Sequence, residues 1–557
     1  MTSRERQLLL GVSFICAPLL YIYPLALDTP LLDPDEGQHA SITLGMVDTG
    51  DYVVPRYLGE PFLDKPILYF AAQAASLRLL GTNEAAVRLP GLLFALLGVL
   101  TTYLLARRLF DSTTAMISSL IALTLIGPLA MAQAAAHDVS LVPWTTLLLL
   151  CFWNMATKPT EFLPVRDILL VAILVAMALL AKGVIGLAVV GVGAVVYAIV
   201  MRQLTIALVV RCLAGIVVGA AIASPWFIAM EIESPGYLLY YFVERHVMGF
   251  ATSSQRHGSA PWYYYMPILV IGALPWTMYA IHGAWHARSE RRETPQHRPI
   301  LFVVCWLLGG LLFLSIAGSK LLTYCLPVFP AVAILAAVAV TRFIQCRAEP
   351  RQELVTRWAI YSMSVVGFVA PIVGIVVMQK YLSESVSVGA VLLAGTCSVL
   401  SIAAVVLLRR EYRVAAVATT PIWIALMFVI LMTWPGQTIA EHFSQRSLAR
   451  HVDKDALPPG AEVWLVGERV SSIAFYLNPQ QRGRYRQGDV KQIGMHEVEN
   501  WSVVPSNVLL AITDNQLDSC RDRTILRDVD LVSVGHFHVL KKIKPVDSSK
   551  LENEKNE

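Results

Sequence analysis

Thirteen long apolar stretches run through this chain of 557 residues and leave little room for a soluble fold. Hydrophobic residues make up 56% of the sequence and charged residues 15%, whereas a soluble domain carries roughly a quarter charged residues. A helix needs about 20 apolar residues to cross a bilayer. We therefore predict a polytopic α-helical membrane protein with spans near residues 6–26, 88–107, 114–134, 139–156, 165–181, 184–201, 206–228, 264–282, 300–317, 321–341, 358–378, 387–408 and 414–434.

Basic residues near the ends of these spans predict the orientation, because Lys and Arg are retained on the cytoplasmic side. The first apolar segment has no small-residue cleavage site and is predicted to be a retained anchor. With the N-terminus inside, each cytoplasmic connection is basic, from Arg4 and Arg6 to Arg409, Arg410 and Arg413. The odd number of spans then places the C-terminal region outside, in the periplasm of a Gram-negative cell. The net charge of +4 thus reflects topology, and it gives no reason to expect binding of nucleic acid.

The polar sequence outside the spans forms three regions. A membrane domain over residues 1–436 would carry two long outward loops, at 27–87 and 229–263, and the stretches His39–Met46 and Ile67–Leu80 are expected to lie along the interface as helices. Residues 437–543 have short Val-, Ile- and Phe-rich runs between turn residues, which predicts a small periplasmic α/β domain. Residues 544–557 are charged and are predicted to be disordered. Of the eight cysteines, only Cys520 is expected to face outward, so no disulfide framework is predicted.

The first outward loop begins with an acidic patch, Asp33-Pro34-Asp35-Glu36. Carboxylates packed at a bilayer surface repel one another and lose hydration, so they call for a cationic partner or a function. The structural alternative is a helix start at which Asp35 stabilises the first turn through the helix dipole. Other polar groups on the same predicted side favour a functional site.

Those further groups come from several loops that are distant in sequence. Lysines at span ends often only reach for lipid headgroups, and this alternative holds for each lysine taken alone. A set of cations beside apolar grooves would suit a lipid phosphate, and carboxylates among them would suit a base or a divalent-ion ligand. The candidates are Asp64-Lys65-Pro66, His137-Asp138, Lys182, Ser319-Lys320 and, from the second loop, Glu244, Arg245, His246, Arg256 and His257.

At these residues the chain resembles the GT-C integral membrane glycosyltransferases of the ArnT-like and protein-mannosyltransferase-like group. The matching segments occur in the family's order over about residues 1–340, while the remaining spans and the outer domain agree in layout more than in sequence. They are Asp35-Glu36 with Thr49-Gly50-Asp51-Tyr52-Val53-Val54-Pro55, Asp64-Lys65-Pro66, His137-Asp138, Lys182-Gly183, Ala260-Pro261-Trp262-Tyr263-Tyr264, and Ser319-Lys320-Leu321 with Tyr324 and Pro327.

The resemblance implies a GT-C fold and transfer of a sugar, with inversion, from a polyprenyl phosphate to lipid A or another envelope glycan or protein on the periplasmic face of the inner membrane. It implies no nucleotide cofactor. Asp35, with Glu36 beside it, matches the catalytic first-loop carboxylate, and Asp138 matches a second one. Lys65 matches the lysine that holds the lipid phosphate. Arg256, Tyr324, Lys320, Lys182 and His137 are the further substrate-binding candidates, and Asp64 and His246 are the candidate ligands of a divalent metal ion.

The sequence departs from the family pattern at two positions. Family members often have Glu where this chain has Asp64, and the aminoarabinose enzymes have Arg where it has Gln38. The reaction class is therefore predicted more firmly than the sugar, and a protein O-mannosyltransferase-like activity is the alternative within this class.

Two hypotheses from other classes remain open at this point. A lipid or sugar transporter would place ionisable residues near the bilayer midplane and often shows two similar halves, whereas the polar groups here gather at one face. An envelope scaffold would leave the loop carboxylates unexplained.

Overall fold

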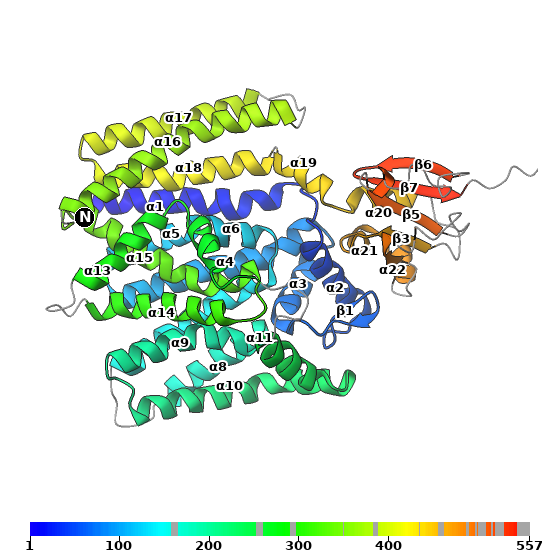
Figure 1. Ribbon diagram of the computed structural model, residues 1–557, viewed down its shortest axis with the longest axis horizontal. Coiled ribbons are helices and arrows are strands. Elements are labelled where there is room, and N and C mark those ends of the chain that lie inside the picture. The colour runs from blue at the N-terminus through cyan, green and yellow to red at the C-terminus, as the bar shows by residue number, and fades with distance from the viewer. Residues whose placement is uncertain are drawn as a thin grey trace, which may run out of the picture. The chain divides into compact units, whose positions relative to one another are not determined.

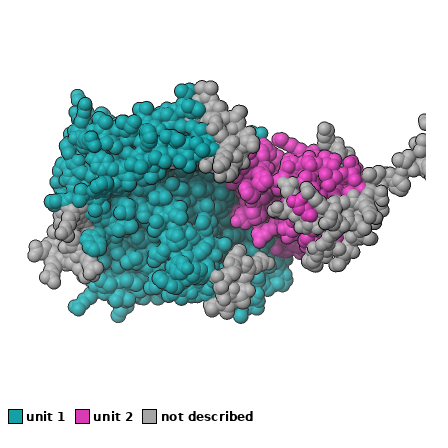
Figure 2. All heavy atoms as spheres, turned by 45° about the horizontal axis from the view of Figure 1, so that its top comes forward, with its two compact units in different colours: residues 1–28, 51–55, 62–436 teal, residues 29–50, 56–61, 437–557 magenta. Residues whose placement is uncertain are grey.

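The computed structural model describes the chain from Met1 to Lys542 apart from residues 158–164, 252–259, 290–296, 349, 382–387, 434, 455–461, 486–489, 496–497, 499–507, 514–515 and 519–528; residues 543–557 also lie outside the described part. Contacts divide the chain into two compact units (Figure 2). Unit 1 comprises residues 1–28, 51–55 and 62–436, and unit 2 comprises residues 29–50, 56–61 and 437–557.

Unit 1 is a bundle of helices (Figure 1). Each of the thirteen apolar stretches expected to span the membrane overlaps at least one of them. In chain order they are α1 (Ser3–Ala17), η1 (Pro18–Ile22), η2 (Tyr23–Ala26), α3 (Ile67–Leu80), α4 (Glu84–Leu109), α5 (Ser112–Thr124), α6 (Ile126–Gln133), η3 (His137–Leu141), α7 (Val142–Thr157), α8 (Val165–Lys182), α9 (Val184–Val200), α10 (Ile206–Glu233), η4 (Leu239–Met248), α11 (Gly249–Ala251), α12 (Tyr265–Gly272), α13 (Thr277–Ser289), α14 (His297–Ile316), η5 (Leu322–Val328), α15 (Phe329–Ile344), α16 (Pro350–Tyr381), α17 (Val388–Arg409) and α18 (Arg413–Thr433).

The helices confirm a polytopic membrane protein. Among the described residues, eight are long and apolar enough to cross a bilayer, or up to ten if each of two bent pairs counts as one span. The count of thirteen stays a prediction. The bends are 53° between α5 and α6 and 109° between α12 and α13. Pro128 follows the first break closely, and Pro275 lies within the second. Proline lacks the amide hydrogen that would continue the helical bonding, which explains a break just before each of them.

The core of unit 1 is built around the span Leu322–Ile344, which comprises η5 and α15. In its most apolar 18-residue stretch, 89% of the residues are buried. Small residues allow neighbouring helices to approach it closely. At Gly283 of α13 a Cβ atom would come within 1.9 Å of the Leu335 carbonyl oxygen of α15, so only glycine fits this crossing.

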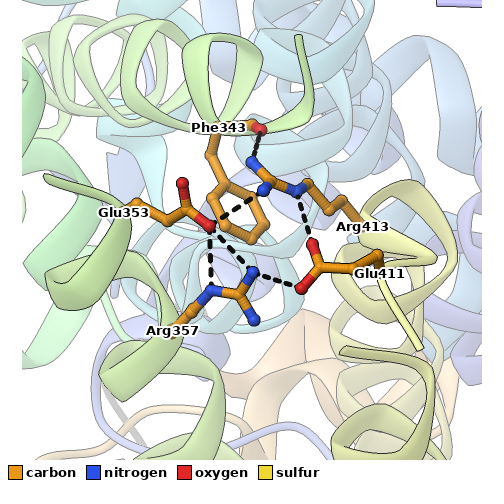
Figure 3. A network of polar contacts seen from close by, with 5 residues as sticks. All are labelled: Phe343, Glu353, Arg357, Glu411 and Arg413. Carbon is orange, nitrogen blue, oxygen red and sulfur yellow. Dashed lines mark hydrogen bonds and ion pairs between the residues drawn. The ribbon is translucent and has the colours of Figure 1, made fainter. Parts of the chain in front are cut away.

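Ion pairs and a hydrogen bond connect α15, α16 and α18 (Figure 3). Arg413, the first residue of α18, donates to Glu353 of α16, to Glu411 and to the carbonyl oxygen of Phe343 in α15, over distances of 2.8, 3.1 and 2.9 Å. Arg357 lies between Glu353 and Glu411 at 2.8 and 2.6 Å. Two arginines balance two carboxylates here, and the network lies among the basic loops that the sequence assigns to the cytoplasm.

Unit 2 combines the expected α/β domain with part of the first loop. Its five-stranded sheet has the order β4-β3-β5-β7-β6, in which β3 is parallel to β4 and β5 while β7 is antiparallel to β5 and β6. The strands are β3 (Glu462–Val466), β4 (Val490–Ile493), β5 (Val508–Thr513), β6 (Val529–Val534) and β7 (Phe537–Lys542), and the helices are α19 (Pro435–His442, which begins in unit 1), α20 (Arg446–Lys454), α21 (Ile473–Tyr476) and α22 (Pro479–Tyr485).

The first loop contributes α2 (Asp35–Thr49) and the hairpin β1 (Arg56–Tyr57) and β2 (Glu60–Pro61) to unit 2. The structure therefore groups the chain differently from the expected boundaries, in which residues 27–87 belong to the membrane domain. The reason is long-range packing of α2 on α21 and of the hairpin on α2. Sequence periodicity contains no signal for such packing.

Candidate active site

A buried carboxylate, Asp138, lies between two lysines in unit 1. It stands in η3, and 4% of the residue is exposed. Lys182, the last residue of α8, donates from Nζ to Asp138 Oδ1, and the Thr323 hydroxyl donates to Oδ2. Lys65 Nζ lies 3.7 Å from Oδ1. The lysine–aspartate cluster, meaning Lys65, Asp138 and Lys182, thus sets two lysine side chains around one carboxylate.

A glycine turn directs Lys182 into this cluster. Gly183 separates α8 from α9 and has a φ of +72°, which side-chain-bearing residues rarely adopt. A Cβ atom at this position would lie 2.7 Å from the Tyr241 hydroxyl and 2.8 Å from His246 Nε2. Both the backbone conformation and the packing therefore require glycine here, and the turn places Lys182 beside η4.

Lys65 is held by the short segment before α3. The carbonyl oxygen of Pro66 lies 3.2 Å from His137 Nε2, and the His137 ring packs on Tyr69 and Phe70 with centroids 5.2 and 5.4 Å apart. Burial lowers the pKa of Lys65, but the neighbouring Asp138 carboxylate raises it, and the pKa ends above its ordinary value. Lys65 is therefore cationic at neutral pH, and His137 supports the segment that carries it.

A second ion pair lies on the other side of Lys65. Arg245 Nε is 3.7 Å from Asp64 Oδ1, and the Tyr240 hydroxyl donates to the same oxygen over 2.7 Å. Both Arg245 and Tyr240 belong to η4, a π-helical segment. The Asp64 carboxylate is thus occupied by two groups from the second outward loop.

A pocket of about 720 Å³, including the solvent at its mouth, opens beside these charges. Its cations outnumber the carboxylates around it, since Lys65, Lys182 and Arg245 face Asp64 and Asp138, and burial lowers the pKa of His246 so that its ring is neutral near pH 7. Apolar side chains form the rest of the wall. The lining residues are Asp64, Lys65, Lys182, Ile185, Tyr241, Arg245, His246, Gly249, Phe250, Phe313, Leu314, Ala317, Ser319 and Tyr324.

Tyr324 of η5 lines the same pocket, with Lys182 Nζ 4.6 Å from the centre of its ring. A cation over an aromatic face is stabilised by the ring quadrupole. The structure thereby brings together five residues singled out in the sequence: Lys65, Asp138, Lys182, Tyr324 and His137, which contacts the Pro66 carbonyl oxygen. An excess of cations next to an apolar wall is a suitable environment for an anion that carries a hydrocarbon chain.

The two first-loop carboxylates predicted to be catalytic, Asp35 and Glu36, lie in unit 2. Asp35 is exposed in the first turn of α2, where the helix dipole favours a negative charge. Glu36 is 2% exposed and accepts a hydrogen bond from the Leu32 amide over 2.8 Å. Glu36 therefore has a structural contact, whereas Asp35 faces solvent.

Lys320 does not line the pocket. The Lys320 ammonium donates to the carbonyl oxygen of Ala317, just beyond the end of α14, and Lys320 is not among the lining residues. Arg256 lies outside the described residues. The roles predicted for these two residues remain predictions.

The predicted metal ligands, Asp64 and His246, both line the pocket but do not by themselves fit a divalent ion. Asp64 contacts Arg245 and Tyr240, and His246 Nδ1 contacts the Tyr241 carbonyl oxygen. Within the described part of the chain no group of three or more His, Cys, Asp or Glu residues could hold a metal. Divalent ions take four or more ligands. Asp64 and His246 supply only two side chains, and both already contact other groups.

Thr323 was not singled out in the sequence, and Arg245 was named there only as one of the second-loop candidates, without a role of its own. Arg245 precedes His246 directly, and Thr323 precedes Tyr324, so both stand beside residues that were chosen. A π-helical turn shifts the direction of the side chains relative to an α-helix, which explains why spacing alone did not separate Arg245 from its neighbours.

Comparison with known proteins gives consistent results. Residues 64–228 match the family model described as dolichyl-phosphate-mannose-protein mannosyltransferase. The chain is 34% identical over 323 residues to the undecaprenyl phosphate-alpha-4-amino-4-deoxy-L-arabinose arabinosyl transferase of Erwinia tasmaniensis, covering 57% of each chain, and 30% identical over 362 residues to that of an Enterobacter species, covering 64% of this chain and 63% of the relative. It thus spans about three fifths of the length of the curated relatives that it matches.

The fold is also that of a solved relative. The crystal structure of ArnT from Cupriavidus metallidurans bound to undecaprenyl phosphate superposes with a TM-score of 0.74, with 22% identity and with coverage of 95% of this chain and 97% of that one. The GT-C fold expected from the sequence, and the resemblance to the ArnT-like group, are confirmed. The multi-pass membrane architecture is confirmed with them.

Proposed function

We propose that this protein is an inverting glycosyltransferase that moves a sugar from a polyprenyl phosphate to an envelope acceptor. Lipid A is the preferred acceptor and 4-amino-4-deoxy-L-arabinose or a related sugar the preferred donor group. The printed names of the sequence relatives specify an undecaprenyl-phosphate-linked aminoarabinose donor. The departures at Asp64 and Gln38 leave the sugar as the least constrained part of the proposal.

The observation that carries the proposal is the uncompensated positive charge of the lysine–aspartate cluster in a pocket with an apolar wall. A polyprenyl phosphate has matching chemistry, with an anionic group at the end of a hydrocarbon chain. A flippase for free sugars would have no use for this charge, and a transporter would place it near the bilayer midplane.

The reaction that follows is a single displacement. An acceptor oxygen attacks the anomeric carbon of the donor sugar, the bond from that carbon to the phosphate oxygen breaks, and the polyprenyl phosphate leaves with the electron pair. Negative charge grows on the phosphate as the bond breaks. Lys65 and Lys182, fixed by Asp138, would stabilise this charge more strongly in the transition state than in the bound donor.

Asp35 is the proposed catalytic carboxylate on the acceptor side, in agreement with the family resemblance. A hydroxyl acceptor would transfer its proton to Asp35 as it attacks. A phosphate acceptor with a second pKa of about 6 is already anionic near neutrality, in which case Asp35 orients it or the sugar. The proposed mechanism needs no nucleotide, and no step of it passes through a metal ion.

The proposed setting is the bacterial inner membrane, with the N-terminus in the cytoplasm and unit 2 in the periplasm. The basic connections support this orientation, since the Arg-rich loop before α16 and the network of Arg357 and Arg413 belong to the side on which Lys and Arg are retained.

Mass spectrometry of lipid A and other envelope glycolipids tests the proposal. Cells that lack the gene are compared with cells that carry wild type or Asp35→Asn, in which only the charge is removed. We expect a sugar-sized mass on lipid A that disappears on deletion and returns with wild type alone.

Two results would redirect the proposal. A sugar mass on a protein fraction but not on lipid A would favour the mannosyltransferase-like alternative that the family description suggests. Unchanged glycolipids and glycoproteins in the deletion strain would overturn a transferase role altogether.

A further inference from the structure

Several contacts join the α2 helix, which carries Asp35, to residues 470–476 of unit 2. The Ser41 hydroxyl donates to the Ser471 carbonyl oxygen over 2.7 Å, and the amide of Leu31, just before the helix, donates to the Tyr476 hydroxyl over 2.8 Å. The hairpin that follows α2 contributes the Tyr57 hydroxyl, which donates to the Val470 carbonyl oxygen. These contacts fix both ends of the first-loop segment within unit 2.

Asp33 supplies the strongest attachment, two residues before Asp35. Its Oδ1 accepts from the Ser472 amide over 2.9 Å, and its Oδ2 accepts from the Ser472 hydroxyl over 2.6 Å and from the Gln445 amide over 3.0 Å. The Asp33 amide in turn donates to the Phe443 carbonyl oxygen over 3.0 Å. One side chain thus joins the start of α2 to two separate segments of the C-terminal sequence.

Gln445 keeps those two segments together. Its side-chain oxygen accepts from the amides of Ser471 and Ile473 over 3.0 and 3.3 Å, and its side-chain nitrogen donates to the Arg469 carbonyl oxygen over 2.6 Å. Gln445 is 2% exposed, so these bonds form away from competing water. The receptor for the Asp33 carboxylate is therefore itself rigid.

The close packing around this attachment leaves no room for a side chain at Gly37. A Cβ atom there would lie 2.0 Å from Asp33 Oδ1 and 2.5 Å from the Ser472 amide nitrogen. Gly45, two turns further along the same helix, has only one atom near such a Cβ, the Arg56 carbonyl oxygen at 4.0 Å. The two glycines lie in the same helix, but only Gly45 has space for an added methyl group.

We infer that the C-terminal part of unit 2, from residue 437 onward, is a positioning platform for α2, the helix that carries the proposed catalytic Asp35. Asp33, Ser472 and Gln445 are the positioning residues that fix where Asp35 lies. The inference rests on the proposed function. It assigns the C-terminal unit a part in the chemical step rather than in binding of the lipid donor, for which unit 1 has its own cluster of Lys65, Asp138 and Lys182.

The test compares Gly37→Ala with Gly45→Ala in the full-length protein in lipid nanodiscs. Sugar transfer from undecaprenyl-phosphate-linked aminoarabinose to lipid A gives kcat and the donor KM, and binding of undecaprenyl phosphate is measured separately. In Gly37→Ala the new methyl group displaces the start of α2, and a shift of about 1 Å at a reacting group lowers kcat by about 100-fold. Donor KM and undecaprenyl phosphate affinity stay at the wild-type values, and Gly45→Ala retains wild-type kcat.

A milder pair guards against failure to fold. Ser472→Ala removes one of the three donors to Asp33 but keeps the amide bond, and Asp33→Asn keeps the volume and loses an acceptor for the Gln445 amide. Both should lower kcat without changing donor KM. The double variant should lose less than the product of the two single losses, because both changes break one attachment.

The outcomes separate this inference from the proposed function. If wild type transfers no sugar, the proposed function fails. If wild type is active and Gly37→Ala has the same kcat, or if every variant weakens undecaprenyl phosphate binding in step with kcat, the platform inference is wrong while the transferase assignment stands.

Discussion

Two largely buried carboxylates, one in each unit, are held in opposite ways. Asp138 in unit 1 is surrounded by the ammonium groups of Lys65 and Lys182. Asp33 in unit 2 accepts hydrogen bonds from neutral groups, the amides of Ser472 and Gln445 and a serine hydroxyl. Burial, with a smaller contribution from the nearby Glu36, raises the pKa of Asp33 to about 7 despite the lowering effect of these bonds.

We interpret the Asp138 surroundings as a ligand-binding site and the Asp33 surroundings as a structural attachment. Two cations around one anion leave a charge that an incoming phosphate can neutralise, so the Asp138 surroundings are incomplete without an anionic ligand. The Asp33 surroundings already satisfy the carboxylate with directional bonds from fixed backbone groups. Such an arrangement sets position and attracts no further anion.

The largest expected effect separates the chemistry from donor binding. Asp35→Asn should lower kcat by about 10³-fold, as expected for loss of a general base or charged orienting group, with the affinity for undecaprenyl phosphate unchanged. Glu36→Gln is the matched change at the next residue, and it should have a much smaller effect because glutamine can still accept from the Leu32 amide. Equal losses in the two variants would contradict the assignment of Asp35. Steady-state kinetics with the full-length protein measure both.

Removal of one cation from the cluster tests the excess charge directly. Lys65→Ala should weaken undecaprenyl phosphate binding by about 30-fold, because a charge-assisted hydrogen bond contributes about 2 kcal/mol. Lys65→Arg should recover part of the loss, since the charge remains. Lys491→Ala, which removes a lysine paired with Glu462 on the surface of unit 2, is the control. Binding of the lipid phosphate to nanodisc-embedded protein gives the result, and equal affinities for Lys65→Ala and wild type would remove the basis of the phosphate site.

Removal of the charge from each carboxylate compares the two surroundings in stability. Asp138→Asn leaves two buried lysines without their counter-ion, and breaking such a pair costs about 3 kcal/mol or more. Asp33→Asn weakens neutral hydrogen bonds that contribute about 1 kcal/mol each. Thermal unfolding at neutral pH should therefore show a larger fall in Tm for Asp138→Asn. Added undecaprenyl phosphate should raise the Tm of Asp138→Asn at least as much as that of wild type and Asp33→Asn, because its phosphate supplies the counter-charge that the variant lacks. The reverse order would mean that the roles of the two sites have been exchanged.

Sequence reasoning succeeded where the signal is local or carried by a family motif. Runs of apolar residues predicted where the helices lie, because each helix satisfies its own backbone bonds within one segment. The resemblance identified Lys65, Asp138 and Lys182, which come from three separate segments. The bends beside Leu125 and Ala273 were not predicted, although Pro128 and Pro275 mark them in hindsight.

Pairings between distant residues were beyond the sequence. Asp33 and Ser472 are 439 positions apart, and no periodicity in either segment reports that one donates to the other. The acidic patch was interpreted as one site, whereas its three carboxylates have three environments. Asp33 accepts hydrogen bonds from Ser472 and Gln445, Glu36 accepts one from the Leu32 amide, and Asp35 is exposed. Burial and hydrogen bonding, which distinguish them, arise only when the chain is folded.

The smallest expected effect is a pH dependence that belongs to Asp33 alone. Because its pKa is raised from 3.8 to about 7 in the folded protein, Asp33 binds its proton more tightly when folded than when unfolded. Its contribution to stability is therefore fully present below about pH 4 and is lost as the pH rises towards 7 and above. The titratable neighbours that interact with it are Glu36 and Tyr57, and Arg469 lies near Tyr57 in turn. Burial raises the pKa of Tyr57 to about 12, so the phenol stays protonated throughout this range. The Tm of wild type should fall between pH 5 and 8 by a component that is missing in Asp33→Asn, with Gly45→Ala as the control that retains it. Identical pH profiles for wild type and Asp33→Asn would show that Asp33 is ionised throughout, and the contrast with Asp138 would then rest on geometry alone.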